Sequence, residues 1–241
     1  MVGKKLLGIN EAKRSVVMMG TLFLGLIVVF MAQGAMGATT TVGPAGSGAD
    51  YTTIQDAINA SSDGDTIRIW DGTYTENVIV NKSVTIEANS SVVLDGQGNN
   101  GTKITVSNVT IQNLSIINCN NSMNTAGVYI YNSSNTLNNV TLDNITVNNS
   151  TGGVFGIDMT ANITQCNFSC NHTVFGMYLM NSNICNISHN EINNTMLAMY
   201  LDNSSHNTIY ENNICNNTHG GIYSYNSTSN NICNNTFWNF G

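Results

Sequence analysis

The sequence predicts an all-β solenoid, with coils of about 22 residues and a short helix at its N-terminal end. The first observation is a repeat: Tyr178, Tyr200 and Tyr223 stand in similar phrases that lie 22 and 23 residues apart, a period typical of stacked structural repeats. The second is that short apolar runs with a period of two alternate with Gly, Asn and Asp from Thr66 onward, as short strands and turns do. Strands this short bury little by themselves. Stacking each coil on its neighbour pairs every strand and forms one continuous core.

The composition limits the classes of molecule that the chain is expected to bind. Only 9% of the 241 residues are charged, and the formal net charge is −7. Asparagine, serine and threonine supply most of the polar surface instead. The chain has no lysine or arginine after Lys103, whereas a surface that neutralises phosphates needs clustered cations. The sequence therefore predicts no nucleic-acid partner.

Residues 1–37 have the pattern of an export signal. Four basic residues precede an uncharged apolar run over 16–32, and Ala35 and Gly37 are the small residues expected before a cleavage site at Ala38. An uncleaved signal anchor is the alternative, since the run is near the lower length limit for crossing a bilayer. That segment would then be the expected membrane contact. Both alternatives predict that the remaining chain is secreted or displayed at the cell surface.

Residues 38–65 are predicted to hold a linker and a capping helix. Small residues dominate 38–48, which favours a linker. Residues 51–60 then place apolar side chains at helical spacing, and Thr52 with Gln55 fits a capping box at the start of the helix. The Asp-Gly dipeptide that follows is expected to end the helix, because it favours a turn.

The solenoid itself is predicted over 66–241. Its first strands are expected at 66–70, 77–80, 83–86 and 92–94, and the whole segment provides about eight coils. The last residues of the chain are apolar and lack the polar terminal cap that solenoids use. We therefore expect either a truncated product or an end covered by another molecule, such as a second copy of this chain.

Three segments carry a resemblance to a known family. Residues 49–58, 64–67 and 72–78 are similar to the opening of pectate-lyase-like right-handed parallel β-helix proteins. The Asn- and Ser-rich repeats beyond them resemble NosD-like β-helix repeats of the type found in surface proteins of methanogenic archaea. The resemblance covers about residues 49–237, and it implies a right-handed parallel β-helix whose first coil is shielded by the N-terminal helix. It implies no single function, because such proteins include lyases, hydrolases, epimerases, binding modules and surface-layer proteins.

One asparagine recurs at the same place in successive repeats. Asn190, Asn212 and Asn235 each follow an isoleucine by three residues. Asparagine tolerates the left-handed backbone of a sharp turn, and stacked side-chain amides hydrogen-bond along a solenoid axis. We predict a structural asparagine ladder in this column.

Other asparagines stand in about twenty N-x-Ser/Thr sequons. A chain so rich in these residue types also produces sequons by chance, which is the alternative to modification. Export and the position of many sequons at predicted turns favour glycosylation. The candidate acceptors are Asn81, Asn108, Asn144, Asn162, Asn171, Asn186, Asn203, Asn216, Asn226 and Asn234.

The repeated tyrosines are the predicted binding surface. If the flanking apolar residues point inward, Tyr178, Tyr200 and Tyr223 point outward by strand alternation and form an aromatic strip. A strip of this kind suits stacking against sugar rings. The alternative is that the tyrosines only cover the backbone and stack on one another. The repeat alignment places Asp158 in the same column.

Catalytic and metal-binding patterns are weak. Enzymes of the resembled family use clustered or paired acids, but no two of the five acidic residues after Lys103 share a column in adjacent coils of the predicted repeat. We therefore favour a non-enzymatic role. His189 and Glu211 each follow their coil's isoleucine by two residues and are expected side by side, as a hydrogen-bonded pair or a weak metal site. The sequence implies no cofactor.

The sequence thus favours an exported, glycosylated structural or adhesive β-helix protein of the cell surface that binds carbohydrate. Cell-surface glycans, other surface proteins and a second copy of the chain are the expected partners. Two alternatives stay open. One is a polysaccharide lyase, hydrolase or epimerase. The other, which the NosD resemblance implies, is a protein that handles copper through repeated Met, His or Cys side chains; Met177 and Met199 form such a column, but at predicted core positions.

Overall fold

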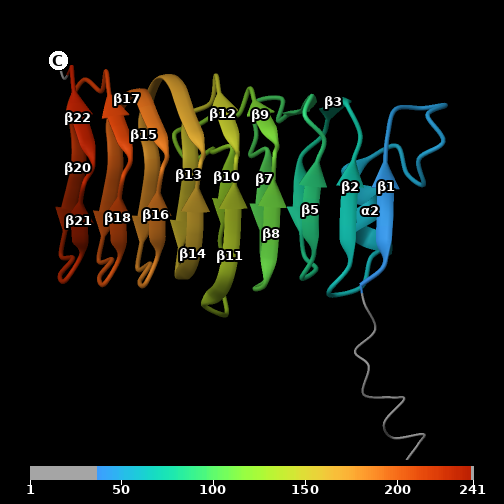
Figure 1. Ribbon diagram of the computed structural model, residues 1–241, viewed down its shortest axis with the longest axis horizontal. Helices are drawn as coiled ribbons and strands as arrows, with labels where there is room; N and C mark the ends of the chain where they lie inside the picture. The colour runs from blue at the N-terminus through green and yellow to red at the C-terminus, as the bar shows by residue number, and fades with distance from the viewer. Residues whose placement is uncertain (1–36, 240–241) are drawn as a thin grey trace, which may run out of the picture. The chain divides into compact units, whose positions relative to one another are not determined.

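The computed structural model describes residues 37–239, which form an all-β solenoid of nine turns. Paired strands run parallel, and successive turns stack along one axis (Figure 1). The predicted fold class is therefore confirmed. The expected signal over residues 1–36 lies outside the described residues. Within 37–239, no helix has both the length and the apolar character needed to cross a bilayer.

One face of the solenoid is a sheet of nine strands, one from each turn. Eight of these strands begin at Thr66 or later, which matches the predicted number of coils, and the ninth precedes Thr66. In spatial order the strands are β1 (Thr39–Val42), β2 (Thr66–Ile69), β5 (Thr85–Ala88), β8 (Val109–Gln112), β11 (Leu137–Asp143), β14 (Met159–Thr164), β16 (Asn186–Ser188), β18 (Thr208–Tyr210) and β21 (Asn231–Cys233).

The other two columns of strands belong to one sheet of thirteen, because β15 (Asn167–Met180) and β17 (Glu191–Asp202) pass through both. The second column consists of β3 (Gly72–Thr75), β6 (Val92–Asp95), β9 (Ser115–Ile117), β12 (Thr146–Asn148), the first parts of β15 and β17, β19 (Asn213–Cys215) and β22 (Thr236–Trp238). The third consists of β4 (Val78–Val80), β7 (Thr102–Ile104), β10 (Val128–Ile130), β13 (Gly152–Ile157), the last parts of β15 and β17, and β20 (Gly220–Tyr225).

Apolar side chains fill the core in columns because successive strand residues point to opposite faces. Ile187, Ile209 and Ile232 are partners in register in three consecutive turns, and the first two are fully buried. Burying one isoleucine contributes about 1.5–3 kcal/mol. Each turn covers the isoleucine of the turn before it, so the repeat in the sequence generates the core.

A column of small residues lets the faces of the solenoid approach one another. Gly153 and Gly176 each directly precede a buried residue of the third column. A Cβ atom added to Gly153 would lie 2.6 Å from Cδ1 of Phe168, which is fully buried on the neighbouring face. The large aromatic side chain therefore occupies the space that a side chain at Gly153 would need.

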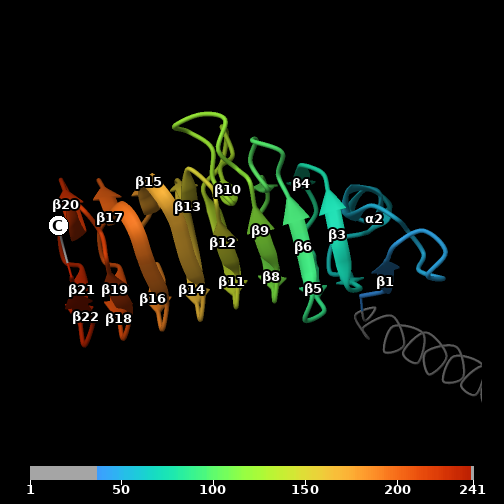
Figure 2. The ribbon, with the colours of Figure 1, turned by 90° about the horizontal axis from the view of Figure 1, so that it is seen from above.

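Helix α2 (Ile54–Ala60) closes the N-terminal end. Its buried residues Ile54, Ala57 and Ile58 join the core of the first turns. Figures 1 and 2 show α2 beside the first strands of the solenoid. The helix thus covers apolar side chains that would otherwise face solvent.

The capping box at this helix differs from the predicted one by one residue. The N-cap is Thr53, whose hydroxyl oxygen accepts the Asp56 N–H at 3.2 Å. Thr52 and Gln55 were the expected pair, but the Gln55 side chain instead accepts the N–H of Ile79 at 2.7 Å. Gln55 therefore ties α2 to strand β4 and is not available for capping.

Strand β1 lies in the segment expected to be a linker. Thr39–Val42 pairs in parallel with β2, and Val42 is fully buried. Because three consecutive residues here are threonines, polar and apolar side chains do not alternate as they do in most strands, and the sequence does not predict a strand. The linker prediction is wrong for these residues, because pairing with β2 gives their backbone groups partners.

The last turn is open. Ile232 and Phe237 are 43% and 45% exposed, although their partners in the preceding turns, Ile209 and Ile214, are fully buried. The expectation that another molecule covers this end stays a prediction.

Candidate functional site

Five aromatic side chains form one row on the outer surface of the third column. They occupy the same register position in consecutive turns, and neighbouring ring centroids lie 4.7 to 5.4 Å apart. We call them the aromatic row: Tyr129, Phe155, Tyr178, Tyr200 and Tyr223. The three tyrosines singled out in the sequence are its C-terminal part.

Sequence reasoning missed the first two members of the row. Phe155 occupies the place predicted for Asp158, because its register partner is Tyr178. Asp158 lies three residues later, where the backbone is left-handed with a φ of 51°. An alignment of the tyrosines alone does not include Phe155, because this residue is a phenylalanine. It does not place Tyr129 either, because the coil between Tyr129 and Phe155 is longer than the later coils of the row.

Two of the four neighbouring pairs in the aromatic row are stacked. The planes of Tyr200 and Tyr223 are 15° apart, and those of Tyr129 and Phe155 are 18° apart. Phe155 and Tyr178 meet edge to face at 63°, and Tyr178 and Tyr200 are tilted by 46°. Stacked rings turn much of their faces toward one another, so at the two ends of the row a ligand gains more contact beside this narrow ridge than on top of it.

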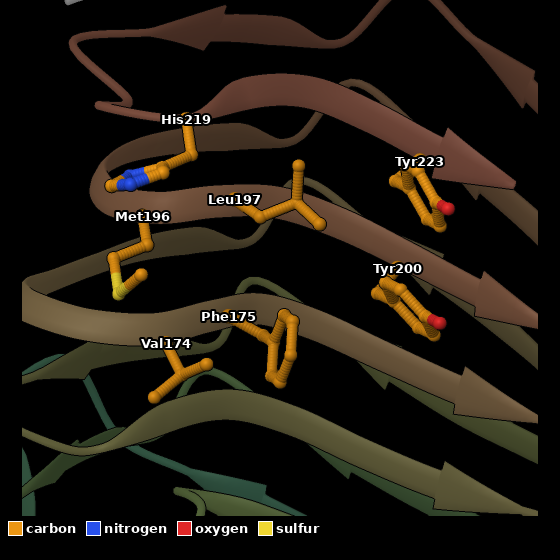
Figure 3. Close-up of a pocket in the computed structure, with 7 residues that line it drawn as sticks. All are labelled: Val174, Phe175, Met196, Leu197, Tyr200, His219 and Tyr223. Carbon is orange, nitrogen blue, oxygen red and sulfur yellow. The ribbon is translucent and has the colours of Figure 1, made fainter.

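A shallow groove lies beside this ridge. Two adjoining hollows of about 400 and 500 Å³ share Val174, Phe175 and Tyr200. Figure 3 shows Leu197 and Phe175 between Met196 and His219 on one side and the tyrosines on the other. We call the two hollows together the axial groove. Its lining is Met123, Asn124, Phe155, Val174, Phe175, Tyr178, Met180, Met196, Leu197, Tyr200, His219 and Tyr223.

One carboxylate is hydrogen-bonded to the wall of the groove. The Tyr178 hydroxyl donates to Asp202 Oδ2 at 3.2 Å. Burial, and then this bond, raise the pKa of Tyr178 to about 12, so the hydroxyl stays protonated at physiological pH. The register partners of Asp202 are Met180 and Tyr225, whereas glycoside hydrolysis commonly requires a pair of carboxyl groups.

The asparagine ladder lies inside the solenoid rather than at its surface. Asn190 and Asn212 are each 1% exposed. The Asn190 amide donates to Asn212 Oδ1 at 3.0 Å, and that of Asn212 donates to Asn235 Oδ1 at 2.9 Å. The same oxygens accept the backbone N–H groups of the preceding turn, at 3.0 and 2.9 Å. The ladder therefore satisfies both side chains and backbone at a buried corner.

The left-handed backbone belongs to a different column. The residues just before the ladder, His189, Glu211 and Asn234, have φ angles of 57°, 54° and 55°. The sequence argument assigned this conformation to the asparagines themselves. The ladder side chains point inward, whereas the left-handed residue at the bend leaves its side chain exposed.

Two further ladders were missed. Ser204 Oγ accepts the Ser182 N–H at 2.9 Å, and Ser227 Oγ accepts the Ser204 N–H at 2.8 Å. Asn207 and Asn230 form a similar ladder at another corner, where Asn230 Oδ1 accepts the Asn207 N–H at 2.8 Å. The recurrence of serine at the end of each tyrosine phrase was the available signal.

The candidate acceptor asparagines are exposed or half-buried wherever the structure describes their side chains. Asn186 and Asn216 are half-buried, and the side chain of Asn171 lies outside the described part. Several sit at left-handed bends, for example Asn144 and Asn203, whose φ angles are 53° and 50°. The exposed candidates are Asn81, Asn108, Asn144, Asn162, Asn203, Asn226 and Asn234.

His189 and Glu211 are neighbours at the surface. The distance between His189 Nε2 and Glu211 Oε2 is 2.8 Å, and about half of each side chain is exposed. Hydrogen bonding satisfies this pair without a metal. Two ligands on an exposed surface are fewer than a stable metal site uses.

A family comparison decides where the chain belongs. The model of a family described as periplasmic copper-binding protein (NosD) matches residues 54–240. The chain belongs to the NosD family. The predicted resemblance to NosD-like β-helix proteins is thereby confirmed.

Relatives of this NosD-family chain include a surface protein. A cell surface glycoprotein of Methanothermus fervidus is 34% identical to it over 116 residues. These residues make up 46% of this chain and 18% of that protein. The chain thus spans less than a fifth of the length of its curated relative.

Solved structures share the fold. Carrot pectin methylesterase superposes with a TM-score of 0.55 at 15% identity, over 81% of this chain and 84% of that one. A lacto-N-biosidase from Eubacterium ramulus has a TM-score of 0.52 at 11% identity, over 80% of this chain and 55% of that one. At these identities the likeness shows a common β-helix architecture and nothing about activity.

The residues of this NosD-family member do not fit a copper site in the described part of the chain. There, no three His, Cys, Asp or Glu side chains come close enough together to hold a metal. Met177 and Met199 are partners in register but are buried in the core. Burial raises the pKa of the Cys166 thiol to about 12, whereas a metal binds the thiolate. The side chains of Met177, Met199 and Cys166 are therefore part of the packed core.

Proposed function

We propose that this chain is an exported β-helix module of the cell surface that binds neutral glycan chains in the axial groove. Membership of a family described as periplasmic, and similarity to a cell surface glycoprotein, support a location outside the cytoplasm. The solenoid supplies a rigid support, because every turn is hydrogen-bonded to the next. Binding rather than turnover is its role.

The observation that carries this proposal is a groove with an aromatic wall along several turns. The Phe175 ring packs against Tyr178 and Tyr200 at centroid distances of 5.3 and 5.6 Å, which places an apolar floor next to tyrosine hydroxyls. Sugar rings present apolar faces bordered by hydroxyl groups. Aromatic residues with a polar tip can contact both. A linear glycan lying along the axis would meet an equivalent set of contacts at each turn.

The charge of this chain favours neutral glycans over acidic ones. No lysine or arginine follows Lys103, while five acidic residues do. Asp202 accepts a hydrogen bond from Tyr178 in the wall of the groove. A polymer of uronic acids would find no lysine or arginine there to pair with and would be repelled by the acidic chain. A neutral glycan avoids this repulsion, so the ligand class is a neutral polysaccharide.

Tyr200→Ala is expected to weaken the binding of neutral oligosaccharides at least tenfold. Tyr200 lines both hollows of the groove, and tenfold corresponds to about 1.4 kcal/mol, a usual loss for a central aromatic contact. Calorimetric titration of a neutral oligosaccharide, chosen from a glycan array, would measure the effect. The matched control is Tyr210→Ala, whose ring packs against His189 away from the groove and whose loss should leave affinity unchanged.

Two results would separate the parts of this proposal. If neither neutral nor acidic glycans bind the parent protein, the binding function is wrong. If oligogalacturonates bind more tightly than neutral chains of equal length, the groove binds glycans but the argument from charge is wrong.

Glycosylation is the second part of the proposed surface role. Glycopeptide mass spectrometry on native protein is expected to find glycans at exposed bends such as Asn144 and Asn203, and none at the sequon of Asn193. Asn193 is only 9% exposed, and its amide donates to Glu191 Oε1 at 2.7 Å. A glycan there would have to displace core packing. Unmodified Asn144 and Asn203, or a modified Asn193, would contradict this prediction.

A further inference from the structure

We propose that Asp65 binds the mature N-terminus, the α-amine that cleavage between Gly37 and Ala38 creates. The Ala38 nitrogen lies 2.7 Å from Asp65 Oδ1. The Thr66 N–H donates to the Ala38 carbonyl at 2.8 Å, directly after Asp65. This inference is independent of the axial groove and of glycan binding.

The Asp65 carboxylate is held in place by its own turn. Its Oδ2 atom accepts the N–H of Ser62 at 2.8 Å, and its backbone N–H donates to the Ser62 carbonyl at 3.2 Å. One carboxylate oxygen is thus used within the turn, and the other is directed at Ala38. A positioned carboxylate loses little freedom when it pairs with a cation.

The chain just before Ala38 is crowded. A Cβ atom on Gly37 would collide with the carbonyl oxygen of Gly64, so only glycine fits at this position in the uncleaved chain. Gly37 is also the small residue required directly before a signal cleavage site. Cleavage removes the crowded residue and keeps Ala38, the residue before strand β1.

Hydrolysis changes the chemistry of the contact. Water adds across the Gly37–Ala38 bond, leaving a carboxylate on Gly37 and an amine on Ala38 that is protonated below the ordinary α-amine pKa of about 8. The bond to the Asp65 carboxylate, which had a charge on its acceptor alone, then becomes an ion pair with a charge on both donor and acceptor. Because β1 is one of the two outermost strands of its sheet and pairs only with β2 there, the ion pair fastens the start of an edge strand.

The first test is the start of the exported protein. N-terminal sequencing of the chain after export by its own leader is expected to begin at Ala38. A different start, or a chain that keeps its leader, would overturn the proposal.

The second test separates charge from hydrogen bonding. The chain from Ala38 on contains every contact described above except those of Gly37, and it is prepared with a free or an acetylated amine. Acetylation keeps an N–H donor but removes the charge. At pH 6.5 and low salt, the free amine is expected to give an unfolding equilibrium constant about two- to fivefold smaller.

Matched variants show whether Asp65 causes the difference in stability between the free and acetylated forms. Asp65→Asn should abolish the difference between the free and acetylated forms, whereas Asp63→Asn should preserve it. Asp63 is a fair control because its carboxylate also accepts a backbone N–H, that of Ser83, at 2.8 Å. If Asp65→Asn does not fold, the parent protein provides the test. There, 1 M salt is expected to reduce the difference in unfolding equilibrium constant between the free and acetylated forms. A difference that survives Asp65→Asn or salt, or no difference at all, would refute the ion pair.

Discussion

Asn212→Leu is expected to lower the free energy of unfolding by about 3 kcal/mol or more. The Asn212 side chain accepts the backbone N–H and a side-chain N–H of Asn190 and donates to the Ile187 carbonyl, at 3.0 Å in each case. Leucine has a similar size but no polar atoms. The substitution therefore leaves buried backbone and amide groups without partners, each of which costs about 1–3 kcal/mol. Chemical denaturation followed by circular dichroism would measure the loss.

Asn186→Leu is the matched control. Asn186 is a half-buried asparagine in the same region, and its amide makes one side-chain bond, to Asn162 Oδ1 at 3.0 Å. Its replacement should cost less than about 1 kcal/mol, because solvent can satisfy the groups that it leaves. Equal losses for the two variants would show that the buried ladder is not the source of stability.

Gly153→Ala is expected to destabilise the protein by about 2 kcal/mol. The added Cβ atom would lie 2.5 Å from the Gly176 carbonyl oxygen and 2.6 Å from Phe168 Cδ1. The first of these is backbone in the next turn, so the strain cannot be relieved by turning one side chain. Both the core and the spacing of the turns that carry the aromatic row would have to adjust.

The neighbouring glycine provides the control for this substitution. A Cβ atom on Gly152 would have its nearest contact at 3.5 Å, an ordinary van der Waals distance. Gly152→Ala should therefore be neutral or stabilise the protein by about 0.5 kcal/mol, since alanine restricts the unfolded chain. Opposite signs at adjacent positions in thermal unfolding would support the packing argument. A loss at Gly152 as large as that at Gly153 would contradict it.

Much of the candidate site could be predicted from the period of the repeat. Tyr178, Tyr200 and Tyr223 lie at nearly equal intervals, and strand alternation places them on the outer surface. Phe155 precedes Tyr178 by a similar interval, but it does not repeat the tyrosine phrase. Tyr129 could not be found in this way, because its register depends on how the longer coil before Phe155 closes. Phe175 and Val174 were also missed, since nothing in the sequence shows that they face the same groove as the tyrosines.

By itself the sequence determined the solenoid, the capping helix, the columns of isoleucine and asparagine, and the shortage of cations that argues against a nucleic-acid partner. Each of these follows from spacing or composition, because stacked coils place equal positions above one another. Only the tertiary structure decided that β1 extends the sheet, that the asparagines face inward, that Tyr129 continues the row, and that Ala38 meets Asp65. Those features depend on contacts between residues from turns of unequal length, where packing and backbone hydrogen bonding, not period, select the neighbours.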